Sequence, residues 1–98
     1  MSFTKNVEPL GEPGVARQLT AGASSVNTAL TNRVYRVSIR ATGADIRFAI
    51  GSGSQTATTS SHFIANGERL DFAVPPGSNI AVIRAGSTSG TLEVTELT

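Results

Sequence analysis

The chain has 98 residues, which is the size of a single domain. Charged residues make up 15% of it, the formal net charge is +1, and it contains no cysteine. This composition excludes disulfide scaffolds, thiolate metal sites, cysteine nucleophiles and a strong electrostatic field for nucleic acid. The chain shows neither the roughly 20-residue apolar run of a membrane span nor the start of a secretory signal. We therefore expect a protein made in a cytosol, without membrane contact.

Residues 1–14 are predicted to form an N-terminal arm, and residues 15–98 a single β domain. Pro9 and Pro13 lack backbone donors, and the stretch has no hydrophobic period. The stretch is either a disordered terminus or an extended arm that becomes ordered only against a partner.

From Val15 onward, apolar residues recur with a period of two, which is typical of strands, and helix is expected to be minor or absent. The clearest strand covers residues 33–41, where Tyr35, Val37, Ile39 and Ala41 share one face. Other strands are predicted at 15–19, 24–30, 46–50, 70–74, 79–85 and 91–97. The Ser- and Thr-rich stretch 51–61 is interpreted as a loop, with a polar edge strand as the alternative.

Asn66-Gly67 predicts a hairpin with a two-residue type I′ turn, because both central residues of that turn need positive φ. The implied register pairs Phe63 with Leu70 and His62 with Asp71. It places Phe63, Leu70 and Phe72 together in the core and turns His62 and Asp71 outward.

Seven or eight short strands separated by Gly-, Pro- and Ser-rich turns predict an all-β fold. We expect a small antiparallel β-sandwich or jelly roll of 7–8 strands with an extended N-terminal arm. A small closed barrel is the alternative architecture.

The residues that carry chemistry are few. His62 is the only histidine, and its predicted neighbour Asp71 is interpreted as a cross-strand pair and not as part of a catalytic site. The carboxylates are scattered, and Glu93 and Glu96 are expected on opposite faces of one strand. We expect no enzyme activity, no metal and no cofactor.

The basic residues suggest an interaction surface, since seven of the eight are arginines. Arginine is enriched in protein interfaces, whereas lysine is depleted there. Arg36, Arg40 and Arg47 are predicted to project from the polar face of neighbouring strands. They form a candidate interface together with Phe3 and Val7 of the arm. The alternative explanation is a GC-rich genome that favours arginine codons.

The chain resembles the small structural proteins of tailed-phage virions, and capsid decoration (cement) proteins in particular. The resemblance rests on the Pro/Gly arm, on an alternating β domain without Cys or Trp, and on the ending 75–97. It implies a non-enzymatic protein, made in the bacterial cytoplasm and localised to the virion, that docks on a capsid lattice and reinforces it.

The partners that this resemblance implies are the major capsid protein or other virion proteins, and copies of the chain itself in a homotrimer. No specific nucleic acid is expected as a partner. The rival hypotheses are a tail, neck or fibre component of the same virion and a glycan-binding module.

Overall fold

The structure is a computed structural model that describes residues 13–97. Within that range the regular elements are eight strands, and no helix is present. The strands are β1 (Pro13–Ala21), β2 (Val26–Ala29), β3 (Arg36–Thr42), β4 (Ile46–Ser52), β5 (His62–Ile64), β6 (Arg69–Ala73), β7 (Ser78–Arg84) and β8 (Gly90–Leu97). The all-β prediction is confirmed.

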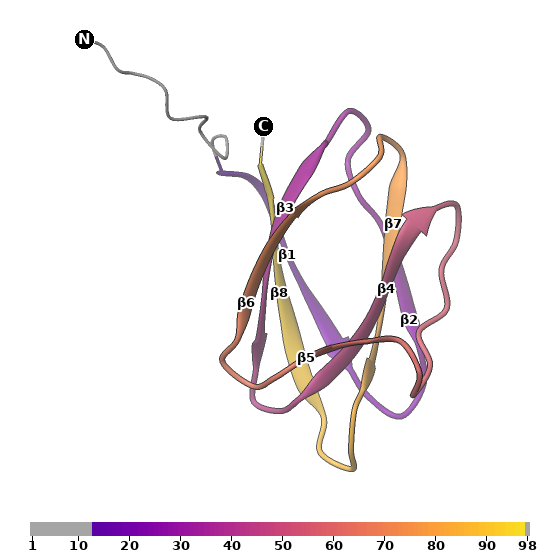
Figure 1. Cartoon of the computed structure of the whole chain (residues 1–98), viewed down its shortest axis with the longest axis vertical. Helices are drawn as coiled ribbons and strands as arrows, with labels where there is room; N and C mark the ends of the chain where they lie inside the picture. Colours follow the sequence, from indigo (N-terminus) through magenta and orange to yellow (C-terminus); the bar gives the residue numbers. More distant parts are fainter. Residues whose placement is uncertain (1–12, 98) are drawn as a thin grey trace, which may run out of the picture.

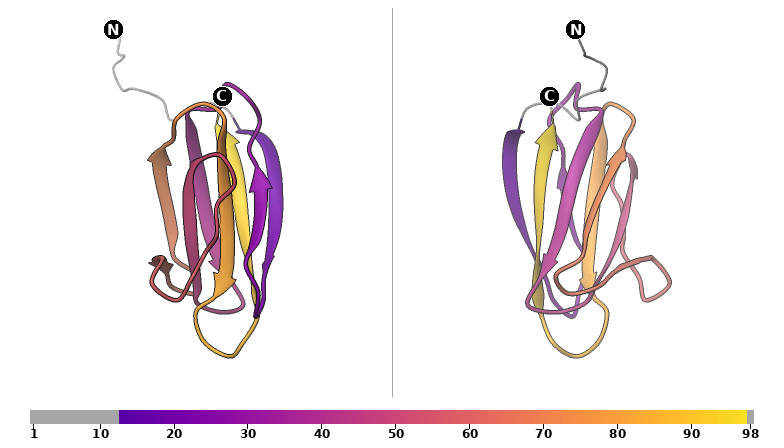
Figure 2. Two further views of the ribbon diagram at one scale, coloured as in Figure 1. Left: turned by 90° about the vertical axis from the view of Figure 1, so that its right-hand side faces the viewer. Right: turned by 60° about the vertical axis from the view of Figure 1, so that its left-hand side comes forward.

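The strands form two four-stranded antiparallel sheets that face each other (Figures 1 and 2). Sheet A has the order β1-β8-β3-β6, and sheet B has the order β2-β7-β4-β5. The pairs β1–β8, β2–β7, β3–β6 and β4–β5 are all hydrogen-bonded. The first four strands thus pair in reverse order with the last four, which is the topology of a jelly roll.

The core lies between the sheets, where the alternating residues of both sheets meet. Val37, Ile39 and Ala41 of β3 are fully buried, as are Ile80 and Val82 of β7. The predicted period of two therefore assigns the buried face of most strands correctly. Tyr35 is an exception, because β3 begins only at Arg36 and the Tyr35 side chain is 56% exposed, while Val34 is buried.

The predicted hairpin around Asn66-Gly67 is wrong. β5 pairs with β4 in sheet B, whereas β6 pairs with β3 in sheet A, so residues 65–68 connect the two sheets. Gly67 has a positive φ of 85°, but Asn66 does not, and the Glu68 amide donates to the Ala65 carbonyl at 2.8 Å. This is the pattern of a type II turn, which needs a positive φ at its third residue only.

The change of sheet also changes which residue of β5 is buried. Phe63 points outward and is 45% exposed, and Ile64 takes the buried position in β5. Leu70 and Phe72 of the edge strand β6 are partly buried and pack against the core, as predicted for their face of the strand.

Most of the loop predicted at 51–61 is observed, over residues 53–61, but Gly51 and Ser52 belong to β4. The loop reaches the far edge of sheet B: the Gln55 amide donates to Asn27 Oδ1, and the Ala57 amide donates to Ser25 Oγ. Ala57 is buried. The last two residues of the predicted arm, 13–14, belong to β1, while residues 1–12 lie outside the described range.

Candidate functional site

Arg36 and Arg40 project from β3 on the outer face of sheet A, as predicted. The register places Arg40 beside Glu93 of β8 on one side and beside Arg69 of β6 on the other. Arg69 in turn donates from Nε to Ser38 Oγ at 3.0 Å and lies 3.9 Å from Asp71. The face therefore carries charges of both signs and is a mixed polar surface.

Arg47 does not join the other two arginines. It belongs to β4 of sheet B, whose outer face points away from that of sheet A. Its Nη1 donates to the Ser61 carbonyl at 3.0 Å, and its guanidinium carbon lies 5.0 Å from the centroid of the Phe63 ring. Phe3 and Val7, the other two predicted interface residues, lie outside the described range.

Arg47 and Phe63 form a defined patch on sheet B, which we call the Arg47–Phe63 patch. The two residues are register partners in β4 and β5, so their side chains lie next to each other on the outer face. The Arg47 guanidinium donates one hydrogen bond to the Ser61 carbonyl. It lies over the exposed Phe63 ring, in the geometry of a cation–π contact. Sequence reasoning missed this pair because it assigned Phe63 to the core.

A groove lies between β5 and β6, which are edge strands of the two described sheets. Its volume is about 370 Å³. It is lined by Phe48, Ile50, His62, Phe63, Leu70, Asp71 and Phe72. The lining is largely aromatic and aliphatic, which is the composition of a surface that binds another apolar group.

His62 and Asp71 both line this groove, but they are not the cross-strand pair that the sequence predicted. They lie in different sheets because β5 and β6 do not pair. The His62 ring instead packs on Phe48, with 5.5 Å between the ring centroids. Phe48 also stacks on Phe72 at 5.9 Å, so one central ring links the two edge strands.

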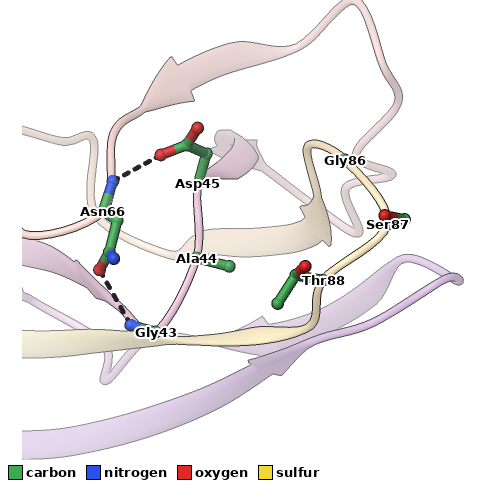
Figure 3. A pocket seen from close by; sticks show the side chains of 7 residues that line it. All are labelled: Gly43, Ala44, Asp45, Asn66, Gly86, Ser87 and Thr88. Atoms are coloured by element: carbon green, nitrogen blue, oxygen red, sulfur yellow. Dashed lines mark hydrogen bonds between the residues drawn. The ribbon is translucent and has the colours of Figure 1, made fainter.

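A polar pocket of about 300 Å³ lies at one end of the sandwich, among three loops (Figure 3). Asp45 Oδ1 accepts from the Asn66 amide at 2.8 Å, and Asn66 Oδ1 accepts from the Gly43 amide at 2.9 Å. These two bonds fix the β3–β4 and β5–β6 turns against each other. Ser87 and Thr88 of the β7–β8 loop line the opposite side.

Glu96 is the one fully buried charged group within residues 14–97, with a side chain that is 1% exposed. Its Oε2 accepts from Arg17 Nε and from the Thr31 amide, both at 2.9 Å. Burial acts to raise the pKa of Glu96, but the hydrogen bonds from Thr31 and the charge and hydrogen bond of Arg17 outweigh it and lower the pKa. This arrangement ties β1 and β8 to the β2–β3 loop and is structural.

The inward orientation of Glu96 follows from the alternating pattern of the sequence. Glu96 continues the inward series of Leu92 and Val94 in β8, and Glu93 points to the other face, as predicted. The partners Arg17 and Thr31 are far from Glu96 in sequence, so only the fold brings them together.

Within residues 13–97, no group of three or more His, Asp or Glu side chains is placed to hold a metal ion. Over the same range, no helix is long and apolar enough to cross a membrane. Comparison of the chain with protein-family models, with curated protein sequences and with solved structures finds no match.

Proposed function

We propose that this chain is a non-enzymatic structural protein of a tailed-phage virion that docks on the capsid lattice and reinforces it. The observation that carries the proposal is the Arg47–Phe63 patch: an aromatic ring that is 45% exposed with a guanidinium stacked on it. Aromatic residues and arginine dominate the energetically important positions of protein interfaces. The jelly roll itself is an architecture used by viral capsid domains, which is an argument by analogy.

The mixed charges on the outer face of sheet A support the same proposal. A protein present in many copies must remain soluble before it docks, and exposed Arg40, Arg69 and Asp71 keep this face hydrated. Docking then depends on shape and on the Arg47–Phe63 patch of sheet B more than on long-range attraction. The partners would be the major capsid protein and neighbouring copies of the chain, in the virion assembled within the host bacterium.

The test uses purified capsids of the virus that encodes the chain, prepared without it. The double variant Arg47→Ala, Phe63→Ala is expected to lose at least tenfold in binding affinity, measured as occupancy after sedimentation. Tyr35→Ala is the matched control, because Tyr35 is also an exposed aromatic residue but directly precedes β3 of the other sheet. Equal occupancy by the double variant and the parent would refute docking through this surface. Arg36→Ala with Arg40→Ala tests the other face in the same way.

A second candidate function is a glycan-binding module of the tail or fibre, and the polar pocket in Figure 3 favours it. Its volume of about 300 Å³ is at the lower end for small-ligand sites. Asp45, Asn66, Ser87 and Thr88 offer the acceptors and hydroxyls that saccharides require. Titration with monosaccharides under NMR observation tests this function. Shifts at residues 43–45 and 86–88 that Asp45→Ala abolishes would support it, and unchanged spectra would reject it.

A further inference from the structure

Strand β1 forms one edge of sheet A. It pairs with β8 on one side, and no strand within residues 13–97 pairs with it on the other. In an antiparallel ladder, alternate residues direct their N–H and C=O groups toward one neighbouring strand, and the residues between them direct theirs to the opposite side. Half of the backbone groups of β1 therefore point away from β8, toward the position of a further strand.

β1 differs from the other three edge strands in its length. It has nine residues, whereas β2 has four, β5 has three and β6 has five. The pairing of β1 with β8 is irregular between Pro13 and Ala16, but the register is unbroken from Ala16 to Ala21. These six consecutive residues offer a longer continuous ladder than any other edge of the two described sheets.

β1 also lacks the outward charges by which edge strands commonly avoid pairing. The residues that alternate with the inward-facing ones are exposed and uncharged: Ala16, Gln18 and Thr20. Arg17, the one charged residue of β1, instead forms its ion pair with the buried Glu96. The edge strand β6, by contrast, exposes both Arg69 and Asp71. Among the long edges of the described sheets, β1 is thus the one without a charged barrier.

The same edge of a second copy fits this edge. Two antiparallel β1 strands related by a two-fold axis present matching donors and acceptors to each other. Directly opposed residues share a face of the sheet, so the axis passes through a residue, and Gln18 and Leu19 are the central positions of the regular segment. In either register the Arg17 side chain lies opposite an apolar residue, the partner's Leu19 or the partner's Ala21. No like charges are therefore directly opposed.

We propose that two copies of this chain pair in solution through antiparallel β1 strands, which joins their two A sheets into one continuous sheet. β1 and β6 are the opposite edges of sheet A (Figure 2), so the pairing uses neither the β5–β6 groove nor the Arg47–Phe63 patch. An edge-to-edge contact buries little area, so the dimer is weak and reversible. The inference concerns the free protein and does not rest on the proposed capsid docking.

Sedimentation equilibrium of the full chain, at concentrations up to about 1 mM, tests the pairing. We expect a monomer–dimer equilibrium. The double variant Gln18→Lys, Thr20→Lys opposes like charges in either register, and it should raise the dissociation constant of the dimer about fivefold or more. Thr91→Lys with Thr95→Lys is the matched control, because these residues are the register partners of Thr20 and Ala16 on the internal strand β8. A parent chain that stays monomeric would overturn the proposal, as would a dimer that both double variants weaken equally.

Opposite charges provide a second, independent measurement. The variant Gln18→Glu, Thr20→Glu, mixed with the corresponding double lysine variant, opposes Lys and Glu in either register. We expect the mixture to form a heterodimer that is tighter than the homodimer of either variant. This gain also shows that both variants are folded. A mixture that associates no better than its two components would overturn pairing through β1.

Amide hydrogen exchange locates the contact in the parent chain. Exchange of alternate amides within residues 16–21 should slow as the protein concentration rises, because every second amide of β1 enters the new ladder. The amides of β6 serve as the reference edge and should exchange at an unchanged rate. Slowing at β6 without slowing at β1 would place the contact at the other edge of sheet A and would overturn the proposal.

Discussion

Arg17 and Glu96 form an ion pair, with 2.9 Å between Nε and Oε2, although 79 residues separate them in sequence. Both side chains point inward from neighbouring strands at one end of the sandwich. The Thr31 amide donates to the same carboxylate oxygen, and the Thr31 hydroxyl accepts from Arg17 Nη2 at 3.2 Å. The pair thus anchors the β2–β3 loop to sheet A.

Replacing Glu96 by Gln should destabilise the protein. The amide keeps the shape of the side chain but removes the charge that compensates Arg17, whose side chain is only 26% exposed. We expect a loss of about 1–3 kcal/mol in the free energy of unfolding, measured by urea denaturation. Glu93→Gln is the matched control on the outer face of the same strand, and an equal effect of both variants would contradict the role of Glu96.

The same carboxylate predicts how stability depends on pH. The pKa of Glu96 is lower in the folded protein than its ordinary value of 4.5, so the unfolded chain takes up its proton first as the pH falls. The stabilisation is therefore complete above pH 4.5 and is lost as the pH falls through the folded-state pKa. The difference in unfolding free energy between the parent and Glu96→Gln should stay constant above pH 4.5 and shrink as the pH falls further, through the folded-state pKa. A difference that does not change below pH 4.5 would rule out the linkage.

Phe72→Ala should lower the melting temperature, whereas Phe63→Ala should change it little. Phe72 packs against the core and stacks on Phe48, so truncation removes roughly half of the about 3–5 kcal/mol typical of a fully buried Phe. Phe63 is 45% exposed and loses little contact. The comparison, made by calorimetry, distinguishes the observed fold from the hairpin that the sequence predicted, because that hairpin buries both rings and would make the two losses equal.

Gly90→Ala should destabilise the start of β8. A Cβ at this position would come within 2.9 Å of the Thr42 carbonyl oxygen and 3.0 Å of the Ala44 amide, and backbone atoms cannot move aside cheaply. We expect a loss of about 1–3 kcal/mol, seen as a lower melting temperature. Gly86→Ala in the preceding β7–β8 loop is the control, since no atom lies within 4 Å of its Cβ position. An unchanged melting temperature of the Gly90→Ala variant would show that β8 does not approach the β3–β4 turn this closely.

The sequence by itself determined the fold class and most of the inward faces. Alternation is a local property: Val37, Ile39 and Ala41 occupy the positions of one strand face whatever strand lies beside them, so their burial followed from the period of two. The same local logic identified most of the loop, predicted at 51–61 and observed at 53–61, and the opposite orientations of Glu93 and Glu96.

Tertiary structure alone decided which strands are neighbours. Asn66-Gly67 allows more than one turn, and the choice between a hairpin and a connection between sheets depends on whether β5 gains more by pairing with β4 or with β6. That competition involves residues far apart in sequence, so no local pattern reports it. It turned Phe63 outward onto Arg47, separated His62 from Asp71, and opened the apolar groove along β6. It also separated Arg47 from Arg36 and Arg40, because the outer faces of two packed sheets point in opposite directions.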